Sequence, residues 1–342
     1  MATVGVIGCG YWGPNLIRNF NQIPEVKIKY ACDLDGKRLQ HIQSLYSEIQ
    51  VTKDYREILK DNSVDAVCIA TPVHTHFPLA KDALLSGKHV LIEKPLTACV
   101  KEAEELIELS ERNKKVLMVD HTFEFTVAVN KIKEIIERNE LGNIFYINSD
   151  RLSLGLFQKD INVVWDLAPH DISIMIYVLR MNPISVSAQG QSHILKGIED
   201  VSMVKVQFPQ NIIAFLRLSW LDPCKVRKMT IVGSQKMLVY DDVEQIEKIK
   251  IYNKRVDVPK YYDTFGDFHF SYKYGDIHIP FLTDIEPLKM VCAHFYESFS
   301  SGNQPRTHGG VGLKVVKVLE AAQQSIKQNG KEIEITYERE TT

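Results

Sequence analysis

The stretch Gly8-Cys9-Gly10-Tyr11-Trp12-Gly13 decides the fold of the N-terminal half. It follows a short apolar run, Thr3–Ile7, and opens a segment whose apolar residues have helical spacing. A Gly-x-Gly-x-x-Gly pattern between a strand and a helix is typical of a dinucleotide-binding turn. We expect Gly8 to permit the tight turn, Gly10 to let the backbone approach a pyrophosphate, and Gly13 to allow close helix–strand packing. The N-terminus of the following helix would then bind the anion.

Asp33 ends the second expected strand, 20 residues after Gly13. A carboxylate at this position accepts hydrogen bonds from the ribose hydroxyls of adenosine and repels a 2′-phosphate, which favours NAD over NADP. Taken alone, Asp33 would be an ordinary turn residue at a strand end. Lys37 and Arg38 lie nearby and would tolerate a phosphate, so NADP stays open as the less favoured cofactor.

Apolar runs alternate with helical segments as far as Val119, which predicts right-handed βαβ units and a doubly wound parallel sheet. Beyond this point, β-type runs follow one another with little helix between them, which predicts an α+β domain with a mostly antiparallel sheet. We therefore expect a NAD-binding Rossmann domain over residues 1–121. A second, α+β domain over 122–342 would follow, with a helix at about 310–328 that packs back toward the first domain.

Composition excludes several classes of protein. The 342 residues are 45% hydrophobic and 25% charged, which is ordinary for globular domains. With 41 basic against 43 acidic residues, the chain lacks the excess of positive charge that nucleic-acid binding requires. No run approaches the length of a membrane span, and no secretory signal is visible at the N-terminus. The six cysteines include no C-x-x-C pair, so we interpret them as reduced, buried thiols of a cytoplasmic protein.

The segment Glu93-Lys94-Pro95-Leu96 follows the fifth expected strand and places a lysine at its carboxyl end. Together with the glycine-rich turn and Ala70-Thr71-Pro72, it resembles the Gfo/Idh/MocA family of oxidoreductases. The resemblance continues through Trp165–Asp171, where family members carry an Asp-x-x-x-His motif, and through Val311–Val316. It implies a Rossmann domain followed by a substrate-binding and oligomerisation domain over residues 122–342, with an open sheet whose face mediates homodimers or homotetramers. It also implies hydride transfer between nicotinamide and a sugar, inositol or related ring alcohol.

The resemblance assigns the catalytic roles to Lys94, Asp166 and His170. Either Lys94 or His170 would take the hydroxyl proton during oxidation, and we assign this step to Lys94. The other would hydrogen-bond the developing alkoxide, and Asp166 would orient the pair. Each residue alone has a structural interpretation: Lys94 as a solvated side chain, His170 as a polar group satisfied in the core, and Asp166 as a helix N-cap with Pro169 in the first turn.

Further residues of the cofactor site are taken from the loops at the strand ends. His74 and His76 could both ligate a metal, but the sequence has no third ligand at suitable spacing, so we expect no metal. The full set expected to bind the cofactor is Gly8, Gly10, Tyr11, Trp12, Gly13, Asp33, Ala70, Thr71, Pro72, His76, Glu93 and Lys94.

A narrower resemblance concerns the substrate. Residues 10–15, 121–123, 150–155 and 160–165 are similar to a branch of nucleotide-sugar 3-dehydrogenases, whose best-known type oxidises carbon 3 of UDP-N-acetylglucosamine for a partner aminotransferase. Arg151 would meet the diphosphate, and a strand-end arginine on the surface is the alternative. Asn162 and Trp165 would contact the sugar or nicotinamide, together with Lys94, Asp166 and His170. For Trp165, core packing is an equal alternative.

Two departures from the branch pattern leave the sugar open: Ser153 replaces an expected Asn, and His308 stands near a usually acidic position. The alternatives are a ketoreductase of a dTDP-deoxysugar, an inositol or sugar dehydrogenase, and a NAD-dependent glycosidase, which would release free sugar without net NADH. A non-catalytic NAD-binding sensor is disfavoured because it need not retain proton-transfer groups.

Overall fold

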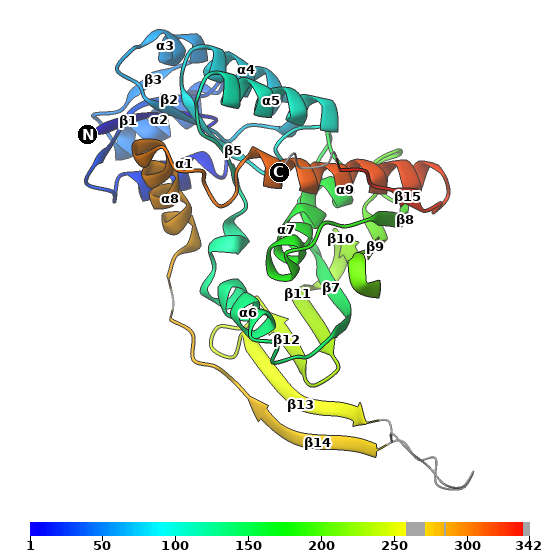
Figure 1. Ribbon diagram of the computed structural model, residues 1–342. Helices are drawn as coiled ribbons and strands as arrows, with labels where there is room; N and C mark the ends of the chain where they lie inside the picture. Colours follow the sequence, from blue (N-terminus) through cyan, green and yellow to red (C-terminus); the bar gives the residue numbers. More distant parts are fainter. Residues whose placement is uncertain (258–270, 284, 338–342) are drawn as a thin grey trace, which may run out of the picture. The chain divides into compact units, whose positions relative to one another are not determined.

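The computed structural model describes residues 1–257, 271–283 and 285–337. The chain divides into two compact units (Figure 1). The first comprises Met1–Thr126 and Glu286–Glu320, and the second comprises Val127–Ile285 and Ala321–Thr342. The first unit therefore includes a segment that lies about 160 residues beyond the end of its Rossmann part, which is possible because chain segments distant in sequence can share one core.

The first unit contains a six-stranded parallel sheet, sheet A, with the order β3-β2-β1-β4-β5-β6. Its strands are β1 (Ala2–Ile7), β2 (Val26–Cys32), β3 (Gln50–Thr52), β4 (Ala66–Ile69), β5 (His89–Glu93) and β6 (Leu117–Asp120). This order reverses between β1 and β4, and ligands of such sheets bind at the carboxyl ends of the strands beside the reversal. The predicted doubly wound parallel sheet is confirmed.

The helices of the first unit follow the strands closely. They are α1 (Gly13–Phe20), α2 (Gly36–Leu45), α3 (Tyr55–Lys60), α4 (His76–Leu85), α5 (Val100–Arg112) and α8 (Pro287–Ser301), with short 3-10 turns η1 (Val73–Thr75) and η2 (Thr122–Phe125). Sequence patterns did not single out α8. It packs against α1, where Phe20 and Phe295 stand edge to face with ring centroids 6.4 Å apart.

The second unit contains a nine-stranded sheet, sheet B, with the order β14-β13-β12-β11-β7-β10-β9-β8-β15. Its pairs are antiparallel except for β7 and β10, which run parallel. The strands are β7 (Ile144–Leu154), β8 (Ser185–Gln191), β9 (Val201–Gln207), β10 (Ile213–Ser219), β11 (Leu221–Gly233), β12 (Met237–Asp241), β13 (Ile249–Asp257), β14 (Ser271–His278) and β15 (Ile333–Glu334). The predicted mostly antiparallel sheet is confirmed, although β8 and β14 were not anticipated.

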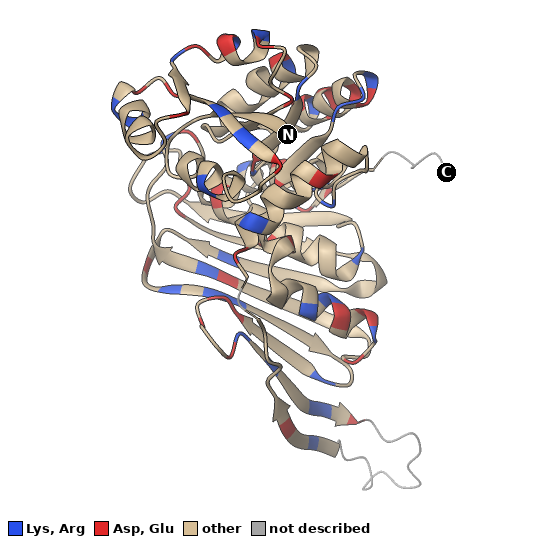
Figure 2. Ribbon diagram, turned by 90° about the vertical axis from the view of Figure 1, so that its left-hand side faces the viewer, with Lys and Arg blue, Asp and Glu red and all other residues tan. Residues whose placement is uncertain are grey.

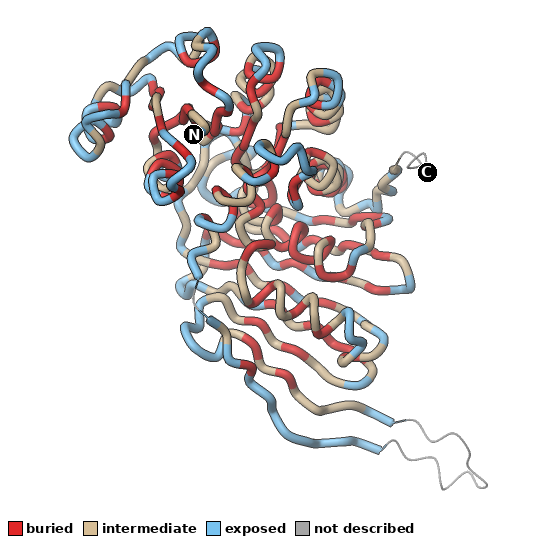
Figure 3. Tube along the Cα trace, turned by 60° about the vertical axis from the view of Figure 1, so that its left-hand side comes forward, coloured by how far each residue is buried: buried red, intermediate tan, exposed pale blue. Residues whose placement is uncertain are grey.

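Two helices, α6 (Val127–Glu137) and α7 (Val163–Leu179), lie on one face of sheet B (Figure 1). The alternation along β10 follows from this arrangement, because Leu216 and Leu218 are buried whereas Phe215 is 45% exposed. The edge strand β14 is exposed over its whole length (Figure 3). The last helix of the chain, α9, spans Gly309–Lys327.

Acidic and basic residues are interspersed along the helices and the strands of sheet B (Figure 2). Many of them form surface ion pairs, such as Arg217 with Asp150 across β10 and β7 at 2.9 Å. Among the helices of the described residues, none combines the length and the apolar character that crossing a membrane requires.

Candidate functional site

The glycine-rich turn has the shape of a phosphate cradle. Gly8 has a φ of +97°, and a Cβ at this position would lie 2.4 Å from the Ala70 carbonyl oxygen. A Cβ on Gly13 would lie 2.0 Å from the Gly8 carbonyl oxygen. Both positions therefore require glycine. A Cβ on Gly10 would meet only the Arg38 guanidinium, 3.6 Å away, so the backbone of Gly10 is open to a ligand. This geometry fits a dinucleotide pyrophosphate at the N-terminus of α1.

Two aromatic side chains extend from the same turn. Tyr11 is 81% exposed and Trp12 is 37% exposed, and their rings meet edge to face with centroids 5.4 Å apart. Large exposed aromatic side chains beside a ligand cradle offer apolar surface that a bound molecule would cover. Their assignment to the cofactor site remains a prediction.

Asp33 joins the end of β2 to the glycine-rich turn. Its carboxylate accepts hydrogen bonds from the Cys9 N–H at 2.7 Å and the Asp35 N–H at 2.8 Å. The Arg38 guanidinium lies 3.4 Å from the same oxygen that Cys9 contacts. Asp33 is 9% exposed, so its orientation is set before any ligand arrives. Each carboxylate oxygen retains further acceptor capacity for a ribose hydroxyl.

The ends of β4 and β5 are joined by His76. Its ring nitrogens lie 2.9 Å from the carbonyl oxygens of Pro95 and Thr71. Burial lowers the pKa of His76, and a neutral ring donates to one of these carbonyls at a time. His76 thus braces the segment around the half-buried Lys94, and a direct contact with the cofactor stays a prediction for this residue. Ala70 and Thr71 lie beside Gly8 at the end of β4, and Pro72 follows them in the sequence. A contact of these three residues with the cofactor stays a prediction.

Three buried titratable groups occupy the carboxyl edge at β5 and β6: Glu93, Asp120 and His121. From the sequence, Glu93 was expected only as a cofactor contact, and Asp120 and His121 had no expected role. Their signal was available in the sequence, because polar residues directly after a buried apolar strand stand at the edge where such sheets bind ligands. His121 is 1% exposed, and neither ring nitrogen has a hydrogen-bonding partner among the described residues.

In the second unit, Asn162 is the N-cap of α7. Its side-chain oxygen accepts hydrogen bonds from Val164 N–H and Trp165 N–H, both at 3.1 Å. Its amide nitrogen donates to Glu199 and Gln323, both at 2.6 Å. The helix begins at Val163, so the alternative structural interpretation of Asp166 as its N-cap is wrong, because Asn162 has this role. The side chain of Asn162 is committed to the fold, so its contact with substrate stays a prediction only.

Asp166 and His170 stand one turn apart on α7, as their spacing predicted, and both are half-buried. The Asp166 carboxylate accepts a hydrogen bond from the indole N–H of Trp220, 3.0 Å away at the end of β10. Trp165 is 9% exposed and belongs to the packed side of the helix. The structure thus brings the Asp and His of the motif together on one helix and orients the Asp through a residue that the sequence did not reveal.

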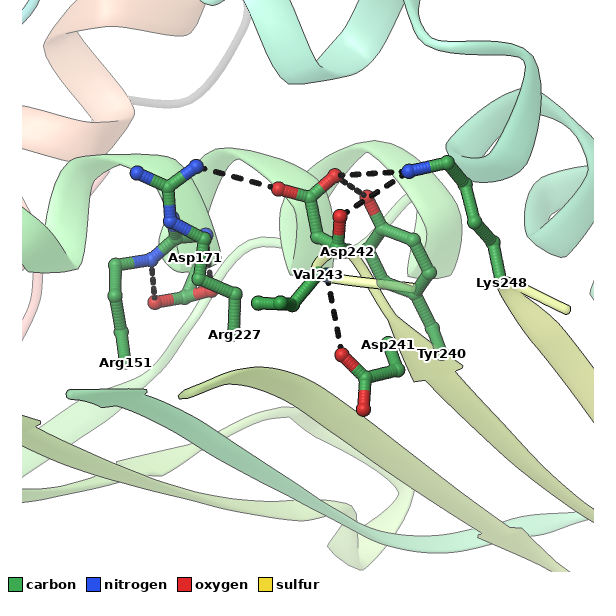
Figure 4. A network of polar contacts seen from close by, with 8 residues as sticks. All are labelled: Arg151, Asp171, Arg227, Tyr240, Asp241, Asp242, Val243 and Lys248. Atoms are coloured by element: carbon green, nitrogen blue, oxygen red, sulfur yellow. Dashed lines mark hydrogen bonds and ion pairs between the residues drawn. The ribbon is translucent and has the colours of Figure 1, made fainter. Parts of the chain in front are cut away.

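Arg151 lies in the interior of the second unit. Its Nε and Nη2 donate to the two oxygens of Asp171 on α7 at 2.8 Å and 2.9 Å, and both side chains are at most 6% exposed (Figure 4). Next to this pair, Asp242 accepts hydrogen bonds from Arg227 and Tyr240 and lies within ion-pair distance of Lys248 (Figure 4). A bidentate buried pair accounts for Arg151 structurally, and its role at a diphosphate remains a prediction without support from this geometry.

No group of three His, Cys, Asp or Glu side chains able to hold a metal occurs in the part of the chain that the structure describes. All six cysteines are free thiols. Four are buried, but Cys99 is half-buried and Cys224 is exposed, so the expectation of uniformly buried thiols is wrong for these two residues. Cys224 follows Pro223 in β11, where the pairing with β7 is irregular and the side chains face solvent.

The fold and the cradle define a dinucleotide-binding Rossmann domain joined to a domain with an open, mostly antiparallel sheet. Two family models match the chain: the NAD-binding Rossmann fold of the Gfo/Idh/MocA oxidoreductase family over residues 2–121, and the C-terminal domain of the same family over residues 129–239. The chain belongs to the Gfo/Idh/MocA family.

Individual relatives are distant. An uncharacterised oxidoreductase of Bacillus subtilis, YrbE, is 29% identical over 201 residues, which cover 54% of this chain and 56% of the relative. A glycosyl hydrolase family 109 protein of Phocaeicola vulgatus is 37% identical over 120 residues, covering 33% of this chain and 23% of the relative. The matches thus span about half or less of these relatives.

The UDP-N-acetylglucosamine 3-dehydrogenase of Acidithiobacillus ferrooxidans is 28% identical over 197 residues, covering 54% of this chain and 57% of that protein. Its solved structure aligns with a TM-score of 0.78 at 22% identity and covers 95% of this chain and 97% of the other. At this identity the structural similarity establishes the shared fold.

Proposed function

We propose that this protein is a NAD-dependent oxidoreductase that transfers a hydride between nicotinamide and a ring hydroxyl or ketone of a nucleotide sugar. Carbon 3 of a UDP-N-acetylhexosamine is the proposed position. The observation that carries the proposal is the half-buried lysine, Lys94, at the carboxyl end of β5, in the same parallel sheet as a glycine cradle that fits a dinucleotide. The similarity to a UDP-N-acetylglucosamine 3-dehydrogenase supports the substrate class.

The bound nicotinamide supplies the hydride acceptor or donor. During oxidation, the Lys94 amine takes the proton of the substrate hydroxyl and becomes an ammonium ion, while the C–H electron pair of the same carbon leaves as hydride. His170 donates a hydrogen bond to the developing alkoxide oxygen. Asp166, oriented by Trp220, favours the orientation of His170 that does so. In the reverse direction Lys94 returns its proton to the ketone oxygen.

Absorbance at the NADH band with NAD and a panel of UDP- and dTDP-sugars tests this proposal. We expect NADH to form with an N-acetylated UDP-sugar and not with the free sugar. Because an unfavourable equilibrium can hide the product, the assay is repeated with a 2-oxo acid to reoxidise NADH and with mass analysis of the sugar. Release of free sugar without net NADH would identify a glycosidase instead, and unchanged sugars throughout would refute a catalytic function on this panel.

We propose further that the protein is a cytoplasmic homodimer or homotetramer whose product is passed to an aminotransferase. Six free thiols support a reducing compartment. The uncovered face of sheet B supports self-association, since Met203 is 63% exposed and Phe215 is 45% exposed beside a groove of about 500 Å³. Light scattering after gel filtration checks the assembly: Phe215→Asp should lower the molar mass, whereas an unchanged monomeric mass in the unsubstituted protein would contradict it.

A further inference from the structure

Two carboxylic acids end adjacent parallel strands of sheet A. Glu93 is the last residue of β5 and Asp120 the last residue of β6, and they stand opposite each other in the register of the pair. Glu93 is 8% exposed and Asp120 is 2% exposed. Side chains that are register partners on neighbouring strands project from the same face of a sheet, so the two carboxyl groups share one site from which water is largely excluded.

The contacts of this pair imply a proton. One oxygen of Asp120 accepts a hydrogen bond from the Thr122 hydroxyl at 2.7 Å. The other oxygen of Asp120 and one oxygen of Glu93 are buried and have no hydrogen-bonding partner among the described residues, although the two residues are register partners. Two ionised carboxylates offer only acceptors, so their contact is favourable only when one of them carries a proton. A single proton held between these two oxygens would give both a partner and would leave one negative charge on the pair.

Lys94 supplies the positive charge that acts on this pair. Burial raises the pKa of Glu93 and of Asp120, and the charge of Lys94 opposes this rise at both residues. Neighbouring groups on other elements are neutral. Burial lowers the pKa of His121 to about 3 and also lowers the pKa of His76 on α4. Burial raises the pKa of the thiols of Cys68 on β4 and Cys292 on α8, which face the same carboxyls.

We propose that Glu93 and Asp120 share one proton and act as a monoanionic pair that positions the Lys94 amine and sets the pH at which it can accept a proton. This inference rests on the proposed function, in which Lys94 performs proton transfer. Both carboxyls are positioning residues. Electrostatic coupling is reciprocal: if the Lys94 charge favours ionisation of the pair, the negative charge of the pair favours the ammonium form of Lys94 to the same extent.

The test is a titration of Lys94 by carbon NMR in protein labelled with ¹³C at lysine Cε, in which Lys94→Arg identifies the resonance by its loss. In Glu93→Gln/Asp120→Asn the negative charge is gone, so the Lys94 midpoint should move to lower pH by about one to three units. Asp120→Asn alone retains the Glu93 carboxylate and should leave the midpoint close to that of the unsubstituted protein. The matched control is Glu108→Gln/Glu111→Gln, which removes two exposed carboxyls from α5.

An unchanged midpoint in the double variant would overturn the proposal. So would carboxyl ¹³C spectra in which Glu93 and Asp120 each lose a proton near pH 4, as independent carboxyls do. If the double variant fails to fold, Lys94→Gln tests the same coupling in reverse. The pair should then keep its proton to higher pH, and an unaltered carboxyl titration in Lys94→Gln would refute the coupling.

None of these titrations needs a sugar substrate. If the Lys94 midpoint shifts as expected but the protein turns over no UDP-sugar, the inference about the carboxyl pair stands and the proposed substrate is refuted. Where turnover is measured, kcat/KM for oxidation is plotted against pH. The rising limb of this profile should move to lower pH in the double variant by the same amount as the NMR midpoint. A loss of kcat with an unmoved limb would assign the pair a merely structural role.

Discussion

Two buried polar regions of this protein contain similar residues and differ in how their charges are satisfied. In the second unit, Arg151 and Asp171 form a bidentate pair, and Asp242 has Arg227, Tyr240 and Lys248 as partners (Figure 4). At the carboxyl edge of sheet A, Glu93, Asp120 and His121 are buried like Arg151 and Asp171, yet each has a polar atom without a hydrogen-bonding partner among the described residues.

The difference separates structural from functional polar groups. A buried charge with complete hydrogen bonding stabilises one arrangement of the chain, and few of its donors or acceptors remain for a ligand. Buried groups with unused acceptors or donors cost folding free energy, and they persist where a ligand or a proton completes them. The second pattern lies at the edge of sheet A where dinucleotides bind in folds of this topology.

The largest expected effect concerns Lys94, on the functional side of this comparison. Lys94→Ala should retain NADH binding, measured by nucleotide fluorescence, and lose about 10²- to 10⁴-fold in kcat because a general base has been removed. Lys101→Ala, on an exposed position of α5, is the matched control and should behave like the unsubstituted protein. Turnover of Lys94→Ala at the unsubstituted rate would refute the role assigned to Lys94.

On the structural side, Asp171→Ala should lower the free energy of unfolding by about 3–5 kcal/mol, because it removes the carboxylate that the buried Arg151 guanidinium contacts. The comparison is Asp150→Ala, which breaks the ion pair with the 52% exposed Arg217 and should cost at most about 1 kcal/mol. Urea unfolding measures both. Equal losses in the two variants would remove the distinction between buried and surface pairs.

The unpartnered His121 should make stability depend on acid. Burial lowers its pKa to about 3, so below its ordinary value of 6.5 the unfolded chain binds a proton that the folded chain does not. Stability therefore falls as the pH falls from about 6.5 toward 3, by up to about 1.4 kcal/mol per pH unit from this group. His121→Asn should flatten this slope between pH 6.5 and 4.5, and the exposed His41→Asn should not. Parallel slopes would show that His121 is not responsible.

The smallest effect is expected at Asn162. Asn162→Ala should cost about 0.5–2 kcal/mol of stability through loss of the helix cap, and Asn162→Ser should recover most of it, because serine also caps well. Thermal unfolding measures the change, and KM for the sugar should stay near its original value. A large rise in KM with little loss of stability would instead support the substrate contact predicted from the sequence.

Sequence reasoning predicted the features that depend on local patterns. The cradle formed by Gly8, Gly10 and Gly13, the alternation of sheet A and the shared helix of Asp166 and His170 all follow from short spacings. The partners Asp171, Trp220 and Asp120 were missed because each is set by how distant segments pack. Helix α8 was missed for the same reason. It packs into the core of the first unit, although the residues of the second unit separate it in sequence from the rest of that core.

By itself, the sequence determined the class of fold and the cofactor, because a strand, a glycine-rich turn and a helix are contiguous and their steric requirements are local. Only the tertiary structure decided which polar groups are satisfied. Arg151 became half of a buried pair and Asn162 a helix cap, while Glu93 met Asp120 across the register of two strands. These outcomes depend on which residues the packing brings within hydrogen-bonding distance and removes from water, and no short stretch of sequence contains that information.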